Sequence, residues 1–343
     1  MDGYTVKEIP LKYEDAVAIT AVKVCGDKVY FGLTGGDAIL IELDPASDSI
    51  RDTGFRFPSK GNKILNKIHN SLAKGPDDLF YIGHGSNINM NKWEFPPVFD
   101  GGHLYSYDPR SGATEDLGLA AARSTVHALE IGDGFLFGYT IPDNHLFAHD
   151  LQLGELTDLG NISGSYSNHN FACAGKKAFG AYARAQQSSQ DKLLVEGTYL
   201  FVYDHEERTY EPTEQIIAPA KLVMDSWVAA SDRIYGGRGD GVLIELDPET
   251  REVREIGIAR PNGGTRITGL AEHDGKIFGT AGFPVMGLFS YEPASGEFRD
   301  YGKVTEEYPR ICYFHGIDIL PDGRVYVGET DSNRPNAYVL EPV

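Results

Sequence analysis

The chain has 343 residues and a formal net charge of −19, with 31 Lys and Arg against 50 Asp and Glu. This acidic balance excludes nucleic acid as the main partner, because binding to phosphates requires a dense basic surface. No apolar run approaches the ~18 residues that a membrane-spanning helix requires, so no membrane partner is expected.

The composition favours short strands and tight turns over long helices, since it combines 40 Gly, 19 Tyr and 17 Phe with only 4 Met. The first residues, MDGYTVKEIPLKYEDAV, lack the basic and apolar regions of a signal peptide. We therefore expect a cytoplasmic protein, or a secreted or periplasmic one if a leader has been removed. The cysteines, Cys25, Cys173 and Cys312, form neither a CxxC pair nor an even-numbered framework, and we interpret them as small buried apolar residues.

One pattern recurs seven times along the chain. It consists of a strand, a tight turn, a second strand that ends in glycine, a third strand, and a turn into a fourth strand. The spacing of about 49 residues fits a propeller blade of four antiparallel strands. The sequence predicts an all-β, seven-bladed β-propeller that forms a single domain over residues 1–343; a β-solenoid or sandwich is the alternative. The expected blades are 14–54, 67–118, 126–160, 168–213, 223–257, 266–302 and 312–343.

The last copy stops after its third strand, whereas residues 3–11 have strand character and no blade of their own. We expect this N-terminal strand to pair with the last blade and close the ring. A closed ring leaves only short, protected sheet edges, which limits pairing between molecules.

The copies can be aligned on the glycine that ends the second strand, and one polar residue then opens each innermost strand. This column contains Thr20, His69, His127, His169, Asp225, Thr268 and His315. Innermost strands begin on the face where second strands end, so the column should surround one mouth of the central channel. The four histidines either contact substrate or line a wet channel, or they hold a divalent metal, for which His69, His127, His169 and His315 are the candidate ligands. No cofactor is otherwise required.

A second column follows the aligned glycines and should project onto the same face. It contains His84, Tyr139, Tyr182, Arg184 and Arg238. The longest loop of this face holds Trp93, and His84 and His103 lie at its two ends, so we expect these two histidines to be neighbours. Imidazoles and a tyrosine hydroxyl can transfer protons, and arginine can bind a carboxylate. The chain has no GxSxG or GxxxxGK[ST] motif, and no close pair of acids that would favour a two-carboxylate glycosidase.

Three runs carry a resemblance to a known family: KIHNS at 67–71, YIGH at 81–84 and GGHLYSYDP at 101–109. They resemble the seven-bladed propeller polysaccharide lyases, which include the ulvan lyases and the rhamnose–glucuronate lyases and are related to propeller rhamnosidases. The likeness extends through the repeats and is most specific in the second to fourth copies. It implies a monomeric carbon–oxygen lyase that cleaves a uronic-acid-containing oligo- or polysaccharide by β-elimination.

The resemblance implies catalytic roles for His84, His103 and Tyr139. In the third strand of the third blade, relatives often carry Gly-His-Leu-Phe-Arg-Tyr-Asp, whereas residues 144–150 here read NHLFAHD. The substrate carboxylate is therefore assigned to Arg184, with Arg238 as the alternative. The residues expected to contact substrate are His69, His127, His169, Tyr182, Arg238, His315 and Trp93. The alternatives are a propeller glycoside hydrolase acting on rhamnose–glucuronate linkages and a non-catalytic propeller that binds glycans or proteins.

Overall fold

The structure is a computed structural model of the chain. It describes residues 3–13, 15–58, 63–86, 99–162, 169–187, 193–219, 222–261, 265–282, 285–305, 313–330 and 335–343. Within these ranges, the side chains of residues 63, 184–187 and 193–195 are outside the description.

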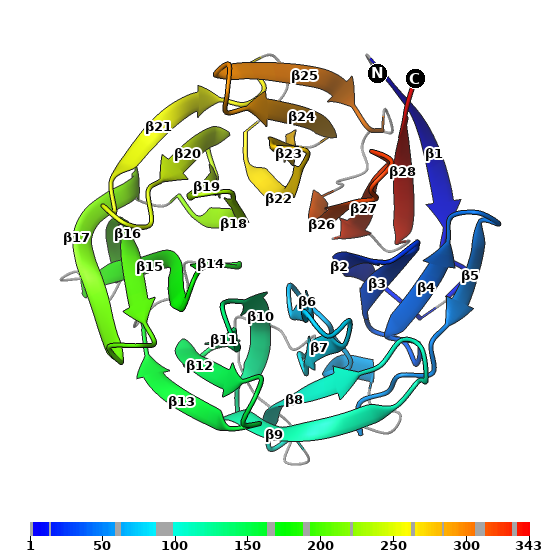
Figure 1. Cartoon of the computed structure of the whole chain (residues 1–343), viewed down its shortest axis with the longest axis horizontal. Helices are drawn as coiled ribbons and strands as arrows, with labels where there is room; N and C mark the ends of the chain where they lie inside the picture. The colour runs from blue at the N-terminus through cyan, green and yellow to red at the C-terminus, as the bar shows by residue number, and fades with distance from the viewer. Residues whose placement is uncertain are drawn as a thin grey trace.

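Across the described residues, the strands form seven four-stranded antiparallel sheets arranged around a central axis (Figure 1). Each sheet is one blade, and its strands run in chain order from the axis to the rim, except in the blade that closes the ring. The predicted fold class, an all-β seven-bladed propeller, is therefore confirmed. The helical structure in the described ranges is the 3-10 turn η1 (Lys63–Leu65), and no helix there is long and apolar enough to cross a membrane.

The first four blades contain the following strands, named from the axis outward. They are β2 (Ala18–Cys25), β3 (Lys28–Thr34), β4 (Leu40–Asp44) and β5 (Ser49–Asp52); β6 (Leu72–Lys74), β7 (Phe80–Gly83), β8 (Gly101–Tyr107) and β9 (Thr114–Ala122); β10 (Thr125–Ile131), β11 (Phe135–Ile141), β12 (His145–Asp150) and β13 (Leu156–Asn161); and β14 (Ala172–Ala174), β15 (Lys177–Gln187), β16 (Leu193–Asp204) and β17 (Thr209–Pro219).

The last three blades follow the same order. They contain β18 (Met224–Ala230), β19 (Arg233–Arg238), β20 (Val242–Leu246) and β21 (Val253–Ile258); β22 (Ile267–His273), β23 (Lys276–Gly282), β24 (Met286–Glu292) and β25 (Glu297–Lys303); and β26 (Tyr313–Ile319), β27 (Val325–Thr330), β28 (Asn336–Pro342) and β1 (Tyr4–Pro10).

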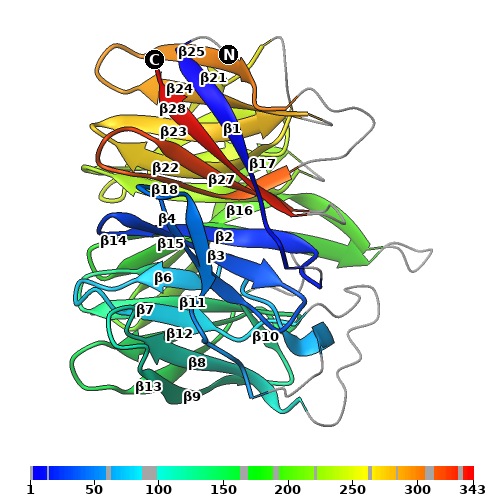
Figure 2. The same ribbon diagram turned by 90° about the vertical axis from the view of Figure 1, so that its right-hand side faces the viewer.

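The N-terminal strand closes the ring. β1 pairs antiparallel with β28, so that Tyr4 lies opposite Pro342 and Pro10 lies opposite Asn336. Figures 1 and 2 show the two strands side by side, with both chain ends at the rim. The expected pairing of the N-terminal strand with the last blade is confirmed. Ile9 is the residue of β1 that is buried, so backbone pairing contributes most of this contact.

The hydrophobic core is divided among the interfaces between neighbouring blades. Between the second and third blades, for example, Tyr81 and Leu104 pack with Leu136 and Phe147. Each fully buried side chain of this size contributes roughly 1.5–3 kcal/mol, so every interface stabilises the two blades that it joins. Cys173 is buried as expected and Cys25 is half-buried, whereas Cys312 lies outside the described residues.

The aligned glycine of the second strand makes room for an aromatic ring. A Cβ atom on Gly138 would lie 1.9 Å from Cζ of Phe147, which is fully buried on the neighbouring strand. Real side chains do not approach this closely, and the ring has no empty space into which to move. Steric exclusion therefore explains this glycine, which lies at the end of the predicted second strand.

The outermost strands share a short Asp-x-Gly turn. In four blades the aspartate accepts a hydrogen bond from the backbone N–H of the glycine two residues later, at 2.8–2.9 Å. The aspartates are Asp52, Asp116, Asp158 and Asp300. Such turns are a local preference of aspartate, and here they set the bend that brings the outer strand against its neighbour.

Candidate functional site

A recurring β-bulge positions the polar column at the channel mouth. In β2, β10, β18, β22 and β26, the pairing with the second strand skips one residue near the start of the strand. The skipped residues are Thr20, His127, Asp225, Thr268 and His315. A bulge bends the strand and redirects the extra side chain, and this feature recurs next to active sites in many folds. His69 and His169 occupy the corresponding places just before β6 and β14.

The structure brings His69, His127, His169 and His315 together from four blades; we call these residues the histidine cluster. The rings of His69 and His127 are stacked, with their centroids 3.9 Å apart and an angle of 19° between the planes. The His169 centroid lies 5.6 Å from each of these two rings and 5.1 Å from that of His315. The cluster is thus a continuous group of imidazoles from four blades.

Three imidazoles of this cluster, those of His69, His127 and His315, favour the neutral form. Burial, followed by the electrostatic effect of neighbouring imidazoles, holds the pKa of His69, His127 and His315 well below the usual range. A neutral imidazole keeps one unprotonated nitrogen, which can accept a proton from a substrate. These three imidazoles therefore have the protonation state that a general base needs near neutral pH.

The described residues do not fit the divalent metal considered as an alternative. No group of three or more His, Cys, Asp or Glu among them is arranged to hold a metal ion. The nearly parallel rings of His69 and His127 do not converge on one point, and Nδ1 of His69 lies 3.1 Å from the backbone oxygen of His127. The stacking of these two rings and the contact of Nδ1 of His69 with the backbone thus leave their nitrogens poorly oriented for binding one metal ion.

Asp225 anchors one side of the cluster. Its buried carboxylate lies 2.7 Å from Nδ1 of His169, which is an ion-pair distance. Arg266 holds the same carboxylate in two places, from Nε at 2.7 Å and from Nη2 at 3.1 Å. Burial alone would raise the pKa of Asp225, but His169 and Arg266 together bring it below the usual range. Asp225 is therefore ionised, and it can orient His169 and stabilise its protonated form.

Three further side chains border the cluster. The Arg266 guanidinium lies over the ring of Tyr313, 4.7 Å from its centroid, and the Arg266 backbone has a φ of +62°. Lys67 is close enough to contribute to the lowered pKa of His69, His127 and His315. Sequence reasoning missed these residues, although each precedes a column residue by two positions. That constant offset from the column could have identified them.

His84 and His103 are neighbours, as expected. The backbone N–H of His84 donates to the backbone oxygen of His103 at 2.9 Å. The His84 ring is buried, with its centroid 4.1 Å from that of Phe57, and its Nε2 lies 2.7 Å from the backbone oxygen of Leu65. Burial lowers the pKa of His84 to about 4. His84 is thus a neutral imidazole enclosed by apolar rings.

The imidazole of His103 belongs to a pairing that other blades repeat. Its Nδ1 lies 3.0 Å from both carboxylate oxygens of Asp116, the aspartate of the Asp-x-Gly turn. In the third blade, Nδ1 of His145 lies 3.0 Å from both oxygens of Asp158. Because the same pair occurs in two blades, a role in the blade itself accounts for its geometry. The catalytic role that the resemblance implies for His103 stays a prediction.

The remaining predicted side chains make contacts within the blades, or lie outside the described residues. The hydroxyls of Tyr139 and Tyr182 are buried and donate to Asn144 and to the backbone oxygen of Thr213, respectively. Arg238 is buried and pairs with Asp240 and Glu255. The side chain of Arg184 and the whole of Trp93 are outside the description. The roles assigned to the five predicted site residues, Tyr139, Tyr182, Arg184, Arg238 and Trp93, stay predictions.

Comparisons with known proteins place the chain by its fold. No family model matches the sequence, and no curated protein matches it. Among solved structures, it is similar to a catalytically inactive variant of virginiamycin B lyase from Staphylococcus aureus, with quinupristin. The TM-score is 0.67 at 13% identity over 99% of this chain and 100% of that chain.

Two further structures share the architecture. The WD40 repeats of RRP9 align with a TM-score of 0.65 at 9% identity, over 98% of this chain and 97% of that chain. The extracellular domain of BT4673 from B. thetaiotaomicron aligns with a TM-score of 0.59 at 15% identity, over 98% of this chain and 40% of that chain. At such low identity these likenesses show the fold alone, a seven-bladed β-propeller whose relatives have different activities.

Proposed function

We propose that the protein is a lyase that cleaves a uronic-acid-containing glycan by β-elimination, and that the reaction takes place at the histidine cluster. The observation that carries this proposal is the chain of contacts from Arg266 through Asp225 to His169, next to imidazoles held in the neutral form. In this proposal His169 is the base, Asp225 stabilises its protonated form and Arg266 supplies the cation.

The chemistry assigns a role to each group. His169 accepts the proton from C5 of the uronate, and the electrons of the C5–H bond form the C4=C5 double bond. The C4–O bond to the leaving sugar then breaks, its electron pair goes to the glycosidic oxygen, and the Tyr313 hydroxyl protonates that oxygen. Lys67 and Arg266 balance the charge that develops on the substrate carboxylate, which makes the C5 proton acidic enough to remove.

Two further lines support a lyase, and the charge of the chain limits the substrate. The sequence resembles propeller polysaccharide lyases, and one solved structure with the same fold is named as a virginiamycin B lyase. The net charge of −19 repels polyanions at long range. Beyond a Debye length of about 8–10 Å this repulsion is screened, so local cations favour a short substrate with one uronate at the site.

The test is turnover of uronate-containing glycans, followed by the ultraviolet absorbance of the unsaturated product. His169→Gln and Asp225→Asn should each lower kcat at least about 100-fold, since proton transfer by a positioned side chain contributes ~10²–10⁴. The control is His145→Gln, which removes the equivalent imidazole of an imidazole–carboxylate pair outside the cluster and should leave kcat within twofold, a difference of about 0.4 kcal/mol. His103→Gln distinguishes the histidine cluster from the site around His84 and His103 that the resemblance implies, since it should lower kcat only if the reaction takes place at that second site.

Other outcomes would replace the proposal. Release of reducing ends without an unsaturated product would identify a glycoside hydrolase. Saturable binding of a glycan or protein without turnover would identify a binding propeller, the activity class of many proteins with this fold. Loss of turnover in His103→Gln, with full activity in His169→Gln, would move the active site to the second blade.

A further inference from the structure

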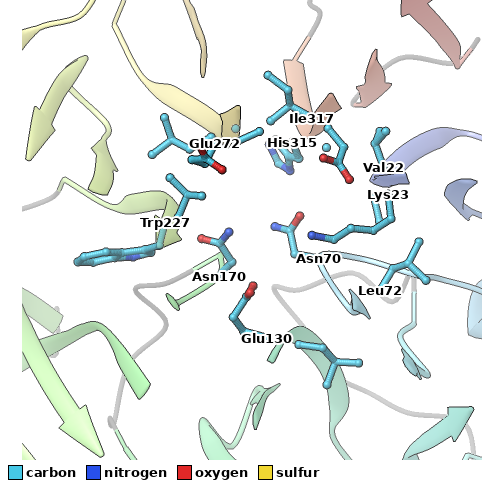
Figure 3. A pocket seen from close by; sticks show the side chains of 18 of the residues that line it. Val22, Lys23, Asn70, Leu72, Glu130, Asn170, Trp227, Glu272, His315 and Ile317 are labelled. Atoms are coloured by element: carbon cyan, nitrogen blue, oxygen red, sulfur yellow. The ribbon is translucent and has the colours of Figure 1, made fainter. Parts of the chain in front are cut away.

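The central channel contains a polar cavity on the axial side of the histidine cluster. It has a volume of about 220 Å³ and is lined by residues of all seven innermost strands or of the segments that lead into them. Figure 3 shows Lys23, Asn70, Glu130, Asn170 and Glu272 around its centre, with His315 at its wall. Glu272 lies near the end of β22 and is exposed, so the cavity opens on the face opposite the channel mouth.

Several polar atoms of this cavity lack hydrogen-bond partners among the described residues. Both ring nitrogens of His315 are buried without a partner, as is Oδ1 of Asn170. Leaving a buried polar atom unpaired costs about 1–3 kcal/mol, so such atoms usually bind water or a ligand. Here they come from two blades and border the same cavity. A neutral imidazole offers one donor and one acceptor, and an amide oxygen is an acceptor.

The charges of the cavity disfavour anionic ligands. The ammonium group of Lys23 lies within electrostatic reach of Glu130 and Asp318. Burial raises the pKa of both carboxyl groups, and Asp318 also accepts a hydrogen bond from the backbone N–H of Val24 at 2.7 Å. An anionic ligand would have to approach two carboxylates in a site of low dielectric, which is unfavourable.

We propose that this axial cavity is a second binding site, which takes a small neutral polyhydroxylated molecule of about one sugar unit. Hydroxyl groups both donate and accept hydrogen bonds, so they match the mixed set offered by His315, Asn170 and Lys23. The volume is adequate, because a cavity of about 150 Å³ holds a benzene ring. Entry is from the face opposite the channel mouth, and the site does not depend on the lyase activity proposed above.

The test measures binding of neutral sugars and polyols to the full chain by calorimetry and ligand-detected NMR. The probes are glucose, galactose, rhamnose and myo-inositol, with glucuronate as the charged comparator. We expect saturable binding of at least one neutral probe and at least tenfold weaker binding of glucuronate. Asn170→Leu and Lys23→Met should each weaken neutral binding about tenfold, as loss of one hydrogen-bonded group predicts.

Two controls separate this site from other effects. Lys176→Met removes a lysine that is outside the cavity lining and pairs with Glu206, and it should leave sugar binding unchanged. Arg266→Gln alters the proposed active site and should leave sugar binding within twofold, so the two proposals can fail separately. If Asn170→Leu does not fold, the binding measured with Lys23→Met tests the proposal. The proposal is overturned if no neutral probe binds saturably, or if binding is the same in wild type and Lys23→Met; water then fills the cavity.

Discussion

Nδ1 of His169 lies 2.7 Å from Oδ1 of Asp225, although the two residues come from adjacent blades. Arg266, which directly precedes the next blade, holds the other oxygen of the same carboxylate. One buried aspartate therefore connects three neighbouring segments at the channel mouth. This connection fixes the orientation of an imidazole, and it also links the blades mechanically.

Replacing Asp225 by Asn should destabilise the fold. The substitution leaves Arg266 and His169 facing a neutral amide in a buried position, and losing one partner of a buried pair costs about 3–5 kcal/mol. Because Arg266 is one-quarter exposed, we expect the lower end of this range, about 3 kcal/mol, in chemical denaturation. Asp232→Asn removes the exposed partner of Arg233 and should cost under about 0.5 kcal/mol. Equal costs for the two variants would contradict the anchoring role.

The histidine cluster should make stability depend on pH. The pKa of His69, His127 and His315 lies below the usual range in the folded protein, so the unfolded chain binds more protons below about pH 6.5. The contribution of these histidines to the free energy of unfolding is therefore fully present above that pH. It decreases as the pH falls towards the pKa values of the folded protein. Each histidine adds a slope of up to about 1.4 kcal/mol per pH unit. Urea denaturation between pH 7 and pH 5 measures the slope.

A single substitution isolates one member of the cluster. His127→Gln removes one buried imidazole and keeps a side chain that can donate and accept hydrogen bonds. The slope of stability against pH should decrease by the equivalent of about one proton, while the stability at pH 7 falls by a separate packing cost. A slope identical to that of the wild type would show that His127 does not contribute to the pH dependence.

The fold could be predicted because its signals are local and repeated. Glycines of the second strands recur at blade spacing, and the clash between a Cβ on Gly138 and Phe147 explains one of them in physical terms. The strands continue past most of these glycines, as β11 continues past Gly138 to Ile141, so the predicted ends of the second strands were too early. The unpaired strand at 3–11 and the missing strand of the last blade likewise predicted the pairing of β1 with β28. These relationships require only strand order, which the sequence pattern conveys.

The candidate site was predicted in part, because the aligned column placed four histidines at one mouth. The β-bulges were not predicted, although they change which later residues face the channel. Lys23, Glu130 and Asp318 each follow a column residue by three positions, an offset that follows from the bulge. The contact of Asp225 with Arg266 joins segments from different sequence repeats. An alignment of the repeats on one another cannot predict contacts between them.

The aligned glycine of the third blade should tolerate no side chain. A Cβ at Gly138 would lie 1.9 Å from a fully buried ring atom of Phe147, so Gly138→Ala forces the core to shift and should cost about 3 kcal/mol or more. Gly112 is the matched control, because it has a φ of +76° and no atom within 4 Å of its Cβ position. Gly112→Ala should cost only the backbone strain, about 1–2 kcal/mol. Thermal unfolding of both variants tests the difference.

Removing residues 1–11 should open the ring. The deletion exposes the edge of β28, which pairs with β1 along its whole length in the native protein. Exposed strand edges pair with other molecules, so we expect a lower Tm and aggregation that increases with protein concentration. Light scattering at several concentrations measures this effect. Adding a synthetic peptide of residues 1–11 should restore solubility; a soluble, fully stable truncated protein would contradict the role of β1 in closure.

Two substitutions of Asp158 can separate the effect of its hydrogen bond in the Asp-x-Gly turn from the effect of its charge. This residue accepts a hydrogen bond from the backbone N–H of Gly160 at 2.8 Å, and its carboxylate pairs with His145 at 3.0 Å. Asp158→Asn keeps an oxygen for the turn and removes the charge; the ion pair is half-exposed, so the cost should be under about 1 kcal/mol. Asp158→Ala also removes the acceptor and should cost about 1 kcal/mol more. If Asn and Ala destabilise the protein equally in urea denaturation, the ion pair rather than the turn holds this outer strand.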